Sequence, residues 1–502
     1  MSEILAGAGV LLAALAGAAA ILLPAGRQRS LAMLAALVLF PVLILGDQWH
    51  TTQITDLRHD DGRIAALLLV GTAVVAALAF LFHRWPVLLP LAIVAALPFR
   101  VPLEAGGDTA NLLVPLYLVI AGGVLATLWR DWSRRGEKAE ARGPIAWLPR
   151  VLAAVLLLYA LQALYSEDFS KGLQNVCFFY VPFAVVYALI SDVKWDRPML
   201  VLVLCVVGVE AALFVLVGTV EFATRELFWN DAVIRSNEFH TYFRVNSVFW
   251  DPNIYGRYLA LVIVVATAPL LWVQGRRNFA LLTVLVAILW FGLTQTFSES
   301  SFLALLAGLA MLAALRWSWR WTLLAVALGI FAIGGIVVAS GKLRPNIIFS
   351  GRWDLVEGGF ELWTERPLWG YGSGGFQAAY SEHRENKDKP VSVSHTEPVT
   401  VLAEQGLIGF ALYLALLVVA LWTMGSGMFK RAAARAPPFA GRGAVLAAFV
   451  ALLVHTMAYA GFYEDPITWV LLAAGASLAA AAARETASAQ PSPAGAATRD
   501  PA

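Results

Sequence analysis

The sequence predicts an all-α integral membrane protein, a polytopic bundle of about 14 transmembrane helices (13–15). Of its 502 residues, 60% are hydrophobic and 14% are charged, whereas soluble domains carry about 25% charged residues. The mean hydropathy is +0.71. Apolar runs long enough to cross a bilayer recur from one end of the chain to the other. Together these observations exclude a soluble globular protein.

Fifteen apolar segments are expected to form the helices. They lie near residues 4–24, 30–46, 64–82, 85–99, 110–128, 148–165, 174–190, 199–222, 253–273, 279–295, 300–315, 320–339, 398–424, 443–460 and 466–483. The segment 85–99 is short and Pro-rich, so it is predicted to be re-entrant or tilted. No basic region precedes the first segment and Glu3 is acidic, so this segment is expected to be a span and not a cleaved signal peptide.

Basic loops set the expected orientation. The strongest runs from Arg130 to Gly143, and smaller ones hold Arg276/Arg277, Arg316/Arg320 and Lys430/Arg431/Arg435/Arg442. The positive-inside rule places them in the cytoplasm. Two larger loops, Thr224 to Pro252 and Gly341 to Glu397, then lie outside the cell. We expect N-terminal spans in 1–223, central spans with the first outer loop in 224–339, a large extracytoplasmic loop in 340–397, C-terminal spans in 398–484, and a disordered cytoplasmic tail in 485–502.

The large outer loop contains an amphipathic pattern. Trp353, Val356, Phe360 and Trp363 are spaced 3, 4 and 3 residues apart, which is one face of a helix. Tryptophans on the apolar side of such a helix favour a position in the bilayer interface. The following "RPLWGYGSGGF" predicts a compact turn. The alternative is a loop that only caps the bundle.

The stretch "SVSHTEPVTVLAEQGLIGF" places a histidine at the mouth of a span. His395 precedes Pro398, a residue suited to the first turn of a helix, and either Thr396 or His395 could cap it. A helix N-terminus attracts anions and keeps a histidine neutral, which suits a general base. The alternative is a capping or snorkelling histidine. Glu404 lies further in and must face the protein interior or a wet cavity.

Three further polar clusters are expected at the same membrane face. "FRVNSVFWDPNIYGRYL" carries Arg244 and Arg257, which are suited to bind phosphate or to snorkel toward lipid headgroups. "TQTFSESSFLAL" holds Glu299 in a tight turn, and "HTMAYAGFYEDPITW" holds Glu464 and Asp465 in another. Their convergence on one face is more informative than any single residue.

The sequence gives no reason to expect a cofactor. It has no metal-ligand spacing, nucleotide-binding loop or serine-nucleophile elbow, and its two cysteines lie inside apolar segments. "GYGSGGF" follows no strand, which makes it a poor phosphate loop. We therefore expect no metal, no other cofactor and no nucleic-acid partner.

These motifs resemble a known family. "RWDLVEGGFELWTERPLWGYGSGGF", "SHTEPVTVLAEQGLIGF", "FRVNSVFWDPNIYGRYLAL" and "LVHTMAYAGFYEDPITWVLLAAG" are similar to the O-antigen ligase and O-antigen polymerase superfamily, over roughly Phe243 to Ala474. The resemblance implies a GT-C-like helical fold in the bacterial inner membrane. It also implies a metal-independent, inverting glycosyltransferase that moves a glycan from undecaprenyl pyrophosphate to an acceptor glycan or lipid anchor at the extracytoplasmic face.

By the same resemblance, His395 is the expected general base, and Arg352 and Arg244 are expected to hold the pyrophosphate. Many members carry a Ser-Arg pair where this chain has Ser298-Glu299. Arg244, Arg257 or Arg366 would have to supply the missing charge. A supporting role is expected for Glu299, Glu397 and Glu404.

Two alternatives remain open at this stage. The run "SHTEPVTVLAEQGLIG" resembles ligase-related members, which favours a ligase over a polymerase. A transporter or flippase of a lipid-linked glycan would also need many spans and buried charges, but its site would lie near the membrane midplane.

Overall fold

The computed structural model describes residues 3–49, 51, 54–55, 59–105, 108–133, 147–228, 230–239, 242–272, 275–339, 353–383, 394–429 and 438–488. Arg352 and the 485–502 tail beyond residue 488 lie outside them. The N-terminal half contains α1 (Glu3–Leu22), α2 (Arg27–Asp47), α4 (Asp61–Arg84), α5 (Leu88–Ala96), β1 (Val101–Ala105), β2 (Asp108–Leu112), α6 (Val114–Ser133), α7 (Trp147–Ala163), α8 (Phe169–Asn175), the π-helical η1 (Val176–Tyr180), α9 (Val181–Ser191) and α10 (Arg197–Thr224).

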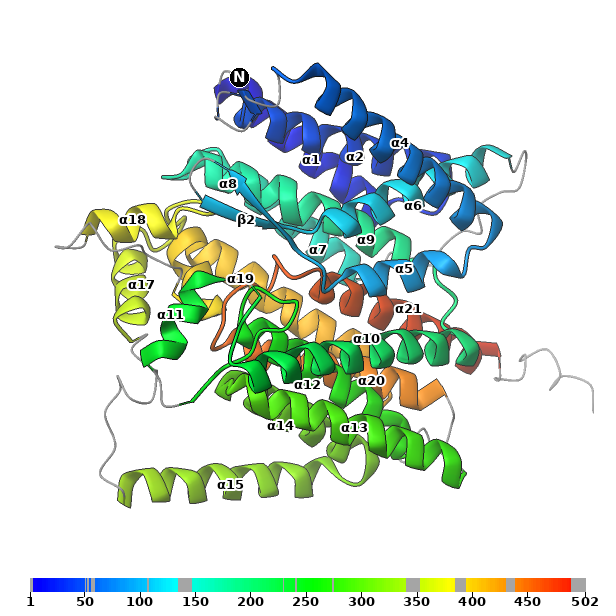
Figure 1. The fold of residues 1–502 in the computed structure, drawn as a ribbon, viewed down its shortest axis with the longest axis vertical. Helices are drawn as coiled ribbons and strands as arrows, with labels where there is room; N and C mark the ends of the chain where they lie inside the picture. The colour runs from blue at the N-terminus through cyan, green and yellow to red at the C-terminus, as the bar shows by residue number, and fades with distance from the viewer. Residues whose placement is uncertain are drawn as a thin grey trace, which may run out of the picture.

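The C-terminal half continues with further helices. They are α11 (Asp231–Phe239), α12 (Pro252–Leu270), α13 (Arg276–Thr296), α14 (Glu299–Arg316), α15 (Trp319–Ala339), α17 (Trp353–Glu365), α18 (Phe376–His383), α19 (Glu397–Gly425), α20 (Pro438–Thr456) and α21 (Pro466–Ser488). The long helices lie side by side across the view of Figure 1, from α1 and α4 at its top to α15 at its bottom.

The predicted helical architecture is confirmed, whereas the count of about 14 spans and the GT-C-like fold stay predictions. A helix occupies each of the fifteen apolar segments, and eleven helices within the described residues are long and apolar enough to cross a membrane. At 85–99 the helix α5 has only nine residues, about 14 Å, which is too short to span a bilayer. The antiparallel hairpin β1–β2 follows it, with Val101 opposite Leu112. The hairpin was not predicted, and α6 begins at Val114 where a span from residue 110 was expected.

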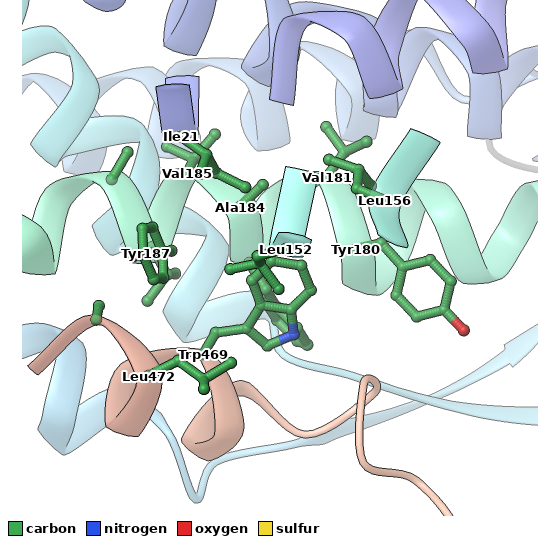
Figure 2. Packing of buried hydrophobic residues seen from close by; sticks show 14 of the residues in the cluster. Ile21, Leu152, Leu156, Tyr180, Val181, Ala184, Val185, Tyr187, Trp469 and Leu472 are labelled. Atoms are coloured by element: carbon green, nitrogen blue, oxygen red, sulfur yellow. The ribbon is translucent and has the colours of Figure 1, made fainter. Parts of the chain in front are cut away.

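The two halves of the chain share one apolar core. Trp469 of α21 is 1% exposed and packs against residues of α7 and α9, as Figure 2 shows with Leu152, Val181 and Ala184. Its indole Nε1 donates to the carbonyl of Tyr463, 2.9 Å away. This hydrogen bond satisfies the buried indole and joins α21 to the preceding α20–α21 connection.

The helix α19 is broken at Gly406, whose backbone is non-helical with φ 62°. A Cβ at this position would lie 2.3 Å from the backbone of Leu368. The break therefore accommodates the turn after α17, and the NH of Leu407 donates to the carbonyl of Pro367 at 2.8 Å. The backbone that approaches Gly406 most closely thus belongs to this turn.

Candidate functional site

Polar side chains gather where four parts of the chain meet. These are the start of α12, the α13–α14 turn, the α20–α21 connection and the start of α19. The sequence clusters at these places are far apart in the chain, and their convergence at one end of the bundle was predicted. The contacts below connect them.

A buried hydroxyl and amide network joins α12 to α14. Ser298 Oγ donates to Asn253 Oδ1 at 2.9 Å and lies 2.8 Å from Ser301 Oγ. The helices approach this closely because residue 256 is glycine: a Cβ there would lie 2.5 Å from Ser301 Oγ. Arg244 Nη2 donates to the same Asn253 Oδ1 at 3.0 Å, and its Nε donates to the carbonyl of Thr296 at 3.0 Å. The network therefore holds the Arg244 guanidinium at the mouth of α12.

The same network reaches two histidines. Ser300 Oγ, 3.2 Å from Ser298 Oγ, lies 3.3 Å from Nε2 of the fully buried His455. The ring of Tyr459 is centred 5.9 Å from that of His455 and 6.2 Å from that of His395. Hydrogen bonds thus link Arg244 to His455, and ring contacts of Tyr459 connect His455 with His395.

His395 sits in an unusual backbone conformation. Its φ is 61°, in the left-handed region that non-glycine residues seldom occupy. Such conformations persist where surrounding contacts enforce them and are common at functional sites. Ser394 supplies one such contact, because its hydroxyl donates to the carbonyl of Thr396 at 2.9 Å. Thr396 occupies the N-cap position, but its side chain makes no capping hydrogen bond, contrary to one of the two expected caps.

Glu397 fixes the start of α19 beside the α20–α21 connection. Its Oε2 accepts from the backbone NH of Gly461 at 2.8 Å and of Phe462 at 3.0 Å. The carboxylate is therefore engaged by backbone donors and does not face an open site. These hydrogen bonds hold the start of α19, which follows His395, against the α20–α21 connection.

Arg257 is buried one turn inside α12. Its Nη2 lies 2.7 Å from Asp465 Oδ2, and the two side chains are 5% and 4% exposed. Asp465 Oδ1 also accepts from the NH of Ile467 at 2.9 Å, so Asp465 caps α21. Arg257 Nη1, by contrast, is buried without a hydrogen-bond partner.

Arg100, which the sequence analysis missed, belongs to the same cluster. It follows α5 and lines a small cavity with Arg257 and Asp465. Burial lowers the pKa of the Arg100 guanidinium, while the charge of Asp465 opposes this shift. The sequence feature that could have identified Arg100 is its position directly after a short apolar segment. Glu464 next to Asp465 has its pKa raised by burial, against the opposing charges of Lys171 and Arg100.

The glycine-rich turn binds a carboxylate of the protein itself. Glu404 is 8% exposed, and its two oxygens accept from the NH of Gly374 at 2.9 Å and of Phe376 at 3.2 Å. The prediction that Glu404 faces the protein interior is confirmed. Because Glu404 already occupies these donors, the turn is a structural anchor and not an open phosphate loop.

The other candidate residues differ in their surroundings. Arg366 Nη2 pairs with Glu167 Oε1 at 2.7 Å, and its guanidinium lies over the ring of Tyr371. Glu299 is exposed in the first turn of α14, where a carboxylate favourably meets the helix dipole. Arg352 lies outside the described residues. Among the residues the structure describes, no group of three or more His, Cys, Asp or Glu side chains could hold a metal ion.

On the amphipathic helix α17, the protein-facing side consists of Leu355, Gly358, Gly359 and Leu362. Phe360 is 44% exposed and Trp363 partly exposed, so the face predicted for the interface is not the one that packs on the protein. Its contact with lipid stays a prediction.

Comparison with known proteins identifies part of this region. Residues 284–414 match the family model described as O-antigen ligase, and no curated protein matches the chain significantly. The match runs from α13 into α19 and includes His395, Glu299 and Arg366. It confirms the resemblance to the O-antigen ligase and polymerase superfamily over a narrower stretch than Phe243 to Ala474. With the apolar helices, it points to a multi-pass bacterial membrane protein with glycosyltransferase-like activity.

Proposed function

Because residues 284–414 match the O-antigen ligase family model, we propose that the protein transfers a glycan from undecaprenyl pyrophosphate to an acceptor hydroxyl. The oxygen of the acceptor attacks the anomeric carbon while His395 takes the hydroxyl proton. The bond from the anomeric carbon to the pyrophosphate oxygen breaks, and undecaprenyl pyrophosphate leaves. Attack opposite the leaving group inverts the anomeric configuration.

The row of groups from His395 through Tyr459 and His455 to Arg244 is the observation that carries this proposal. A base and a cation held in one network suit a reaction that removes a proton while negative charge grows on a leaving group. Arg244 and Arg257 would hold the pyrophosphate. Arg352 is proposed for the same role on the family resemblance alone.

A reconstituted assay tests the base. His395→Ala is expected to lower the transfer rate of purified protein with a lipid-linked glycan roughly 10²–10⁴-fold. Melting temperature should change little because His395 is only partly buried. The matched control is His383→Ala, which removes an exposed histidine of α18 and should keep activity. Retained activity in His395→Ala would contradict the role, and activity should survive EDTA.

The acceptor decides between ligase and polymerase. We propose a ligase, which forms no product until a separate anchor is supplied. A ladder of longer lipid-linked products from the repeat unit alone would establish a polymerase instead.

A transporter is supported by one observation, the broken helix α19, because discontinuous helices often bind substrates in transporters. Here the protein's own turn fills the break, through the hydrogen bond between Leu407 and Pro367. We therefore favour the enzyme. Uptake of labelled lipid-linked glycan into sealed vesicles with no new glycosidic bond would reverse this preference.

The proposed orientation in the bacterial inner membrane puts the site on the extracytoplasmic face. Cysteines introduced by Ser381→Cys and Ser133→Cys should react oppositely with an impermeant thiol reagent on intact cells. Labelling of the second variant from outside would overturn the orientation.

A further inference from the structure

Arg257 has more hydrogen-bonding capacity than its surroundings satisfy. A guanidinium carries five N–H donors, and a buried charge normally has them engaged. The described contact of this side chain is the Asp465 ion pair, and Nη1 has no hydrogen-bond partner. Asp465 Oδ2 also accepts no well-directed hydrogen bond. The pair is therefore neutralised in charge but incomplete in hydrogen bonding.

A second arginine faces the same place from the other half of the chain. Arg100 interacts electrostatically with both Asp465 and Arg257. It also lines a cavity of about 10 Å³ with these two residues, between the end of α5 and the starts of α12 and α21. The buried Arg257 and the partly buried Arg100 thus both lie beside one carboxylate, that of Asp465, which is ion-paired with Arg257. The carboxylate of Glu464 also interacts electrostatically with Arg100, and it interacts with Lys171 as well.

The cavity has room for about one water molecule and not for a phosphate group. A phosphate could reach both arginines only by taking the place of the Asp465 carboxylate. That displacement is chemically reasonable, because phosphate and carboxylate oxygens bind guanidinium groups with the same bidentate geometry.

We propose that Arg100 and Arg257 together bind a phosphate group of the lipid-linked donor, and that Asp465 occupies this position until the donor displaces it. The inference rests on the proposed function and deepens it, because it assigns the second cation of the site to the N-terminal half. Arg100 lies outside the matched family segment and outside every cluster predicted from the sequence.

Three substitutions test this assignment in the full-length protein in phosphatidylcholine nanodiscs. Arg100→Gln removes the charge, and Arg100→Lys keeps it without the bidentate fork. Asp465→Asn removes the competing charge but still caps α21, because Asn caps helices as well as Asp. The control is Arg316→Gln, which removes an arginine at the opposite end of α14, where it donates to the carbonyl of Leu271. Melting temperatures identify variants that fail to fold.

The readouts are donor affinity, the separate kcat and KM of transfer, and competition by inorganic pyrophosphate. Arg100→Gln should weaken donor binding roughly 10- to 100-fold, the fold-change of one lost hydrogen bond to a charged group. Arg100→Lys should recover part of this loss. Asp465→Asn should strengthen binding of donor and of pyrophosphate, because it removes the competitor. In the Arg100→Gln/Asp465→Asn double variant, the gain in donor affinity from Asp465→Asn should be smaller than in the single variant. Both substitutions act on one site, so their effects should not add.

Two results would overturn the proposal. One is an Arg100→Gln variant that binds donor as Arg316→Gln does; the other is weaker donor binding in Asp465→Asn. Adding phosphatidylglycerol to the nanodiscs separates the possible sources of phosphate. If that lipid competes as strongly as pyrophosphate, the site binds lipid headgroups and the donor assignment is wrong. A wild-type protein that neither binds nor transfers the donor would reject the proposed function itself, whereas transfer unaffected by Arg100→Gln rejects only this inference.

Discussion

Three buried glutamates and the buried Arg257, at the end of the bundle that holds the candidate site, differ in how fully the protein satisfies their hydrogen-bonding groups. Glu221, Glu397 and Glu404 each accept hydrogen bonds from at least two backbone NH groups of a connecting loop. Glu221, for example, is 0% exposed and binds the NH of Ser247 at 2.7 Å. Arg257 is as deeply buried, yet part of its guanidinium has no partner.

The difference separates anchors from candidate binding groups. A buried polar group whose partners are all supplied by the protein is a structural feature, and its removal should damage the fold. A buried charge with incomplete partners adds little to stability, so another reason is needed for its presence. By this criterion the three glutamates are structural anchors, and Arg257 is a candidate binding group.

The largest effect is expected from breaking an anchor. Glu404→Ala leaves the buried NH groups of Gly374 and Phe376 without an acceptor, at about 1–3 kcal/mol each. Stability and transfer activity should therefore fall together. Thermal denaturation in detergent measures the first, and Glu404→Gln, which keeps one acceptor oxygen, should lose less. An unchanged melting temperature in Glu404→Ala would show that the turn does not depend on this anchor.

Replacing the Arg257–Asp465 ion pair by uncharged side chains, with Glu464 left as a countercharge for Arg100, should behave in the opposite way. Arg257→Met combined with Asp465→Asn removes both charges, and such replacements of buried pairs are often neutral or stabilising. We expect unfolding free energy within about 1 kcal/mol of wild type and transfer reduced roughly 10²–10³-fold, as when an electrostatic donor is lost. Marked destabilisation with normal kinetics would place Arg257 among the anchors.

A smaller effect is expected where α17 packs beside the anchored turn. A Cβ at Gly358 would lie 2.0 Å from Cε2 of Tyr380, so Gly358→Ala must displace α17 or α18. Overpacking of this kind costs about 1–3 kcal/mol. Gly71→Ala is the control, because a Cβ there meets nothing within 4 Å. Equal melting temperatures for the two variants would contradict the close packing.

The smallest effect concerns an exposed ion pair, which is neither a buried anchor nor a buried charge with unsatisfied donors. His383 Nε2 lies 3.1 Å from Glu365 Oε2. The pKa of His383 is raised by its hydrogen bond to the carbonyl of Ala379 and by the neighbouring Glu365. The pKa of Glu365 is lowered by its hydrogen bond with the Tyr371 hydroxyl and by His383. The histidine part of the stabilisation is complete below its ordinary pKa of 6.5 and is lost as pH rises through the raised value. The glutamate part is present above 4.5 and is lost as pH falls through the lowered value.

The pair should therefore stabilise the α17–α18 contact most between these two ordinary values. Because both side chains are more than one-third exposed, the gain is at most about 1 kcal/mol. The hydrogen-exchange protection factors of α17 and α18 should be higher at pH 5.5 than at pH 8 in the wild type. In His383→Gln the protection factors at the two pH values should be nearly equal. A difference that persists in the variant would assign it to another group.

Local patterns predicted most of the helices, since apolar run length depends on neighbouring residues alone. The same reasoning indicated α17 and the buried position of Glu404. It missed the hairpin β1–β2, although the two strands are separated in the sequence by Gly106 and Gly107, a pair that favours a tight hairpin turn. It also missed the hydrogen bond of Glu404 with Gly374 and the cavity that Arg100 lines with Asp465, because each joins segments distant in the chain. Long-range pairing of polar groups is decided by helix packing, which no single stretch of sequence contains.

The break in α19 also determines how far the site stands from the middle of the membrane. The nineteen residues after Gly406, 407–425, form a rod of about 28 Å, which matches the hydrocarbon thickness of about 30 Å. The part before the break extends the helix by roughly 13 Å, more than the roughly 5–8 Å of one headgroup layer. We therefore expect His395, at the start of α19, to lie outside the hydrocarbon layer, near the phosphates of the proposed polyprenyl carrier. Lengthening 407–425 by one turn would raise the histidine by about 5 Å while the carrier phosphates stay at the membrane surface.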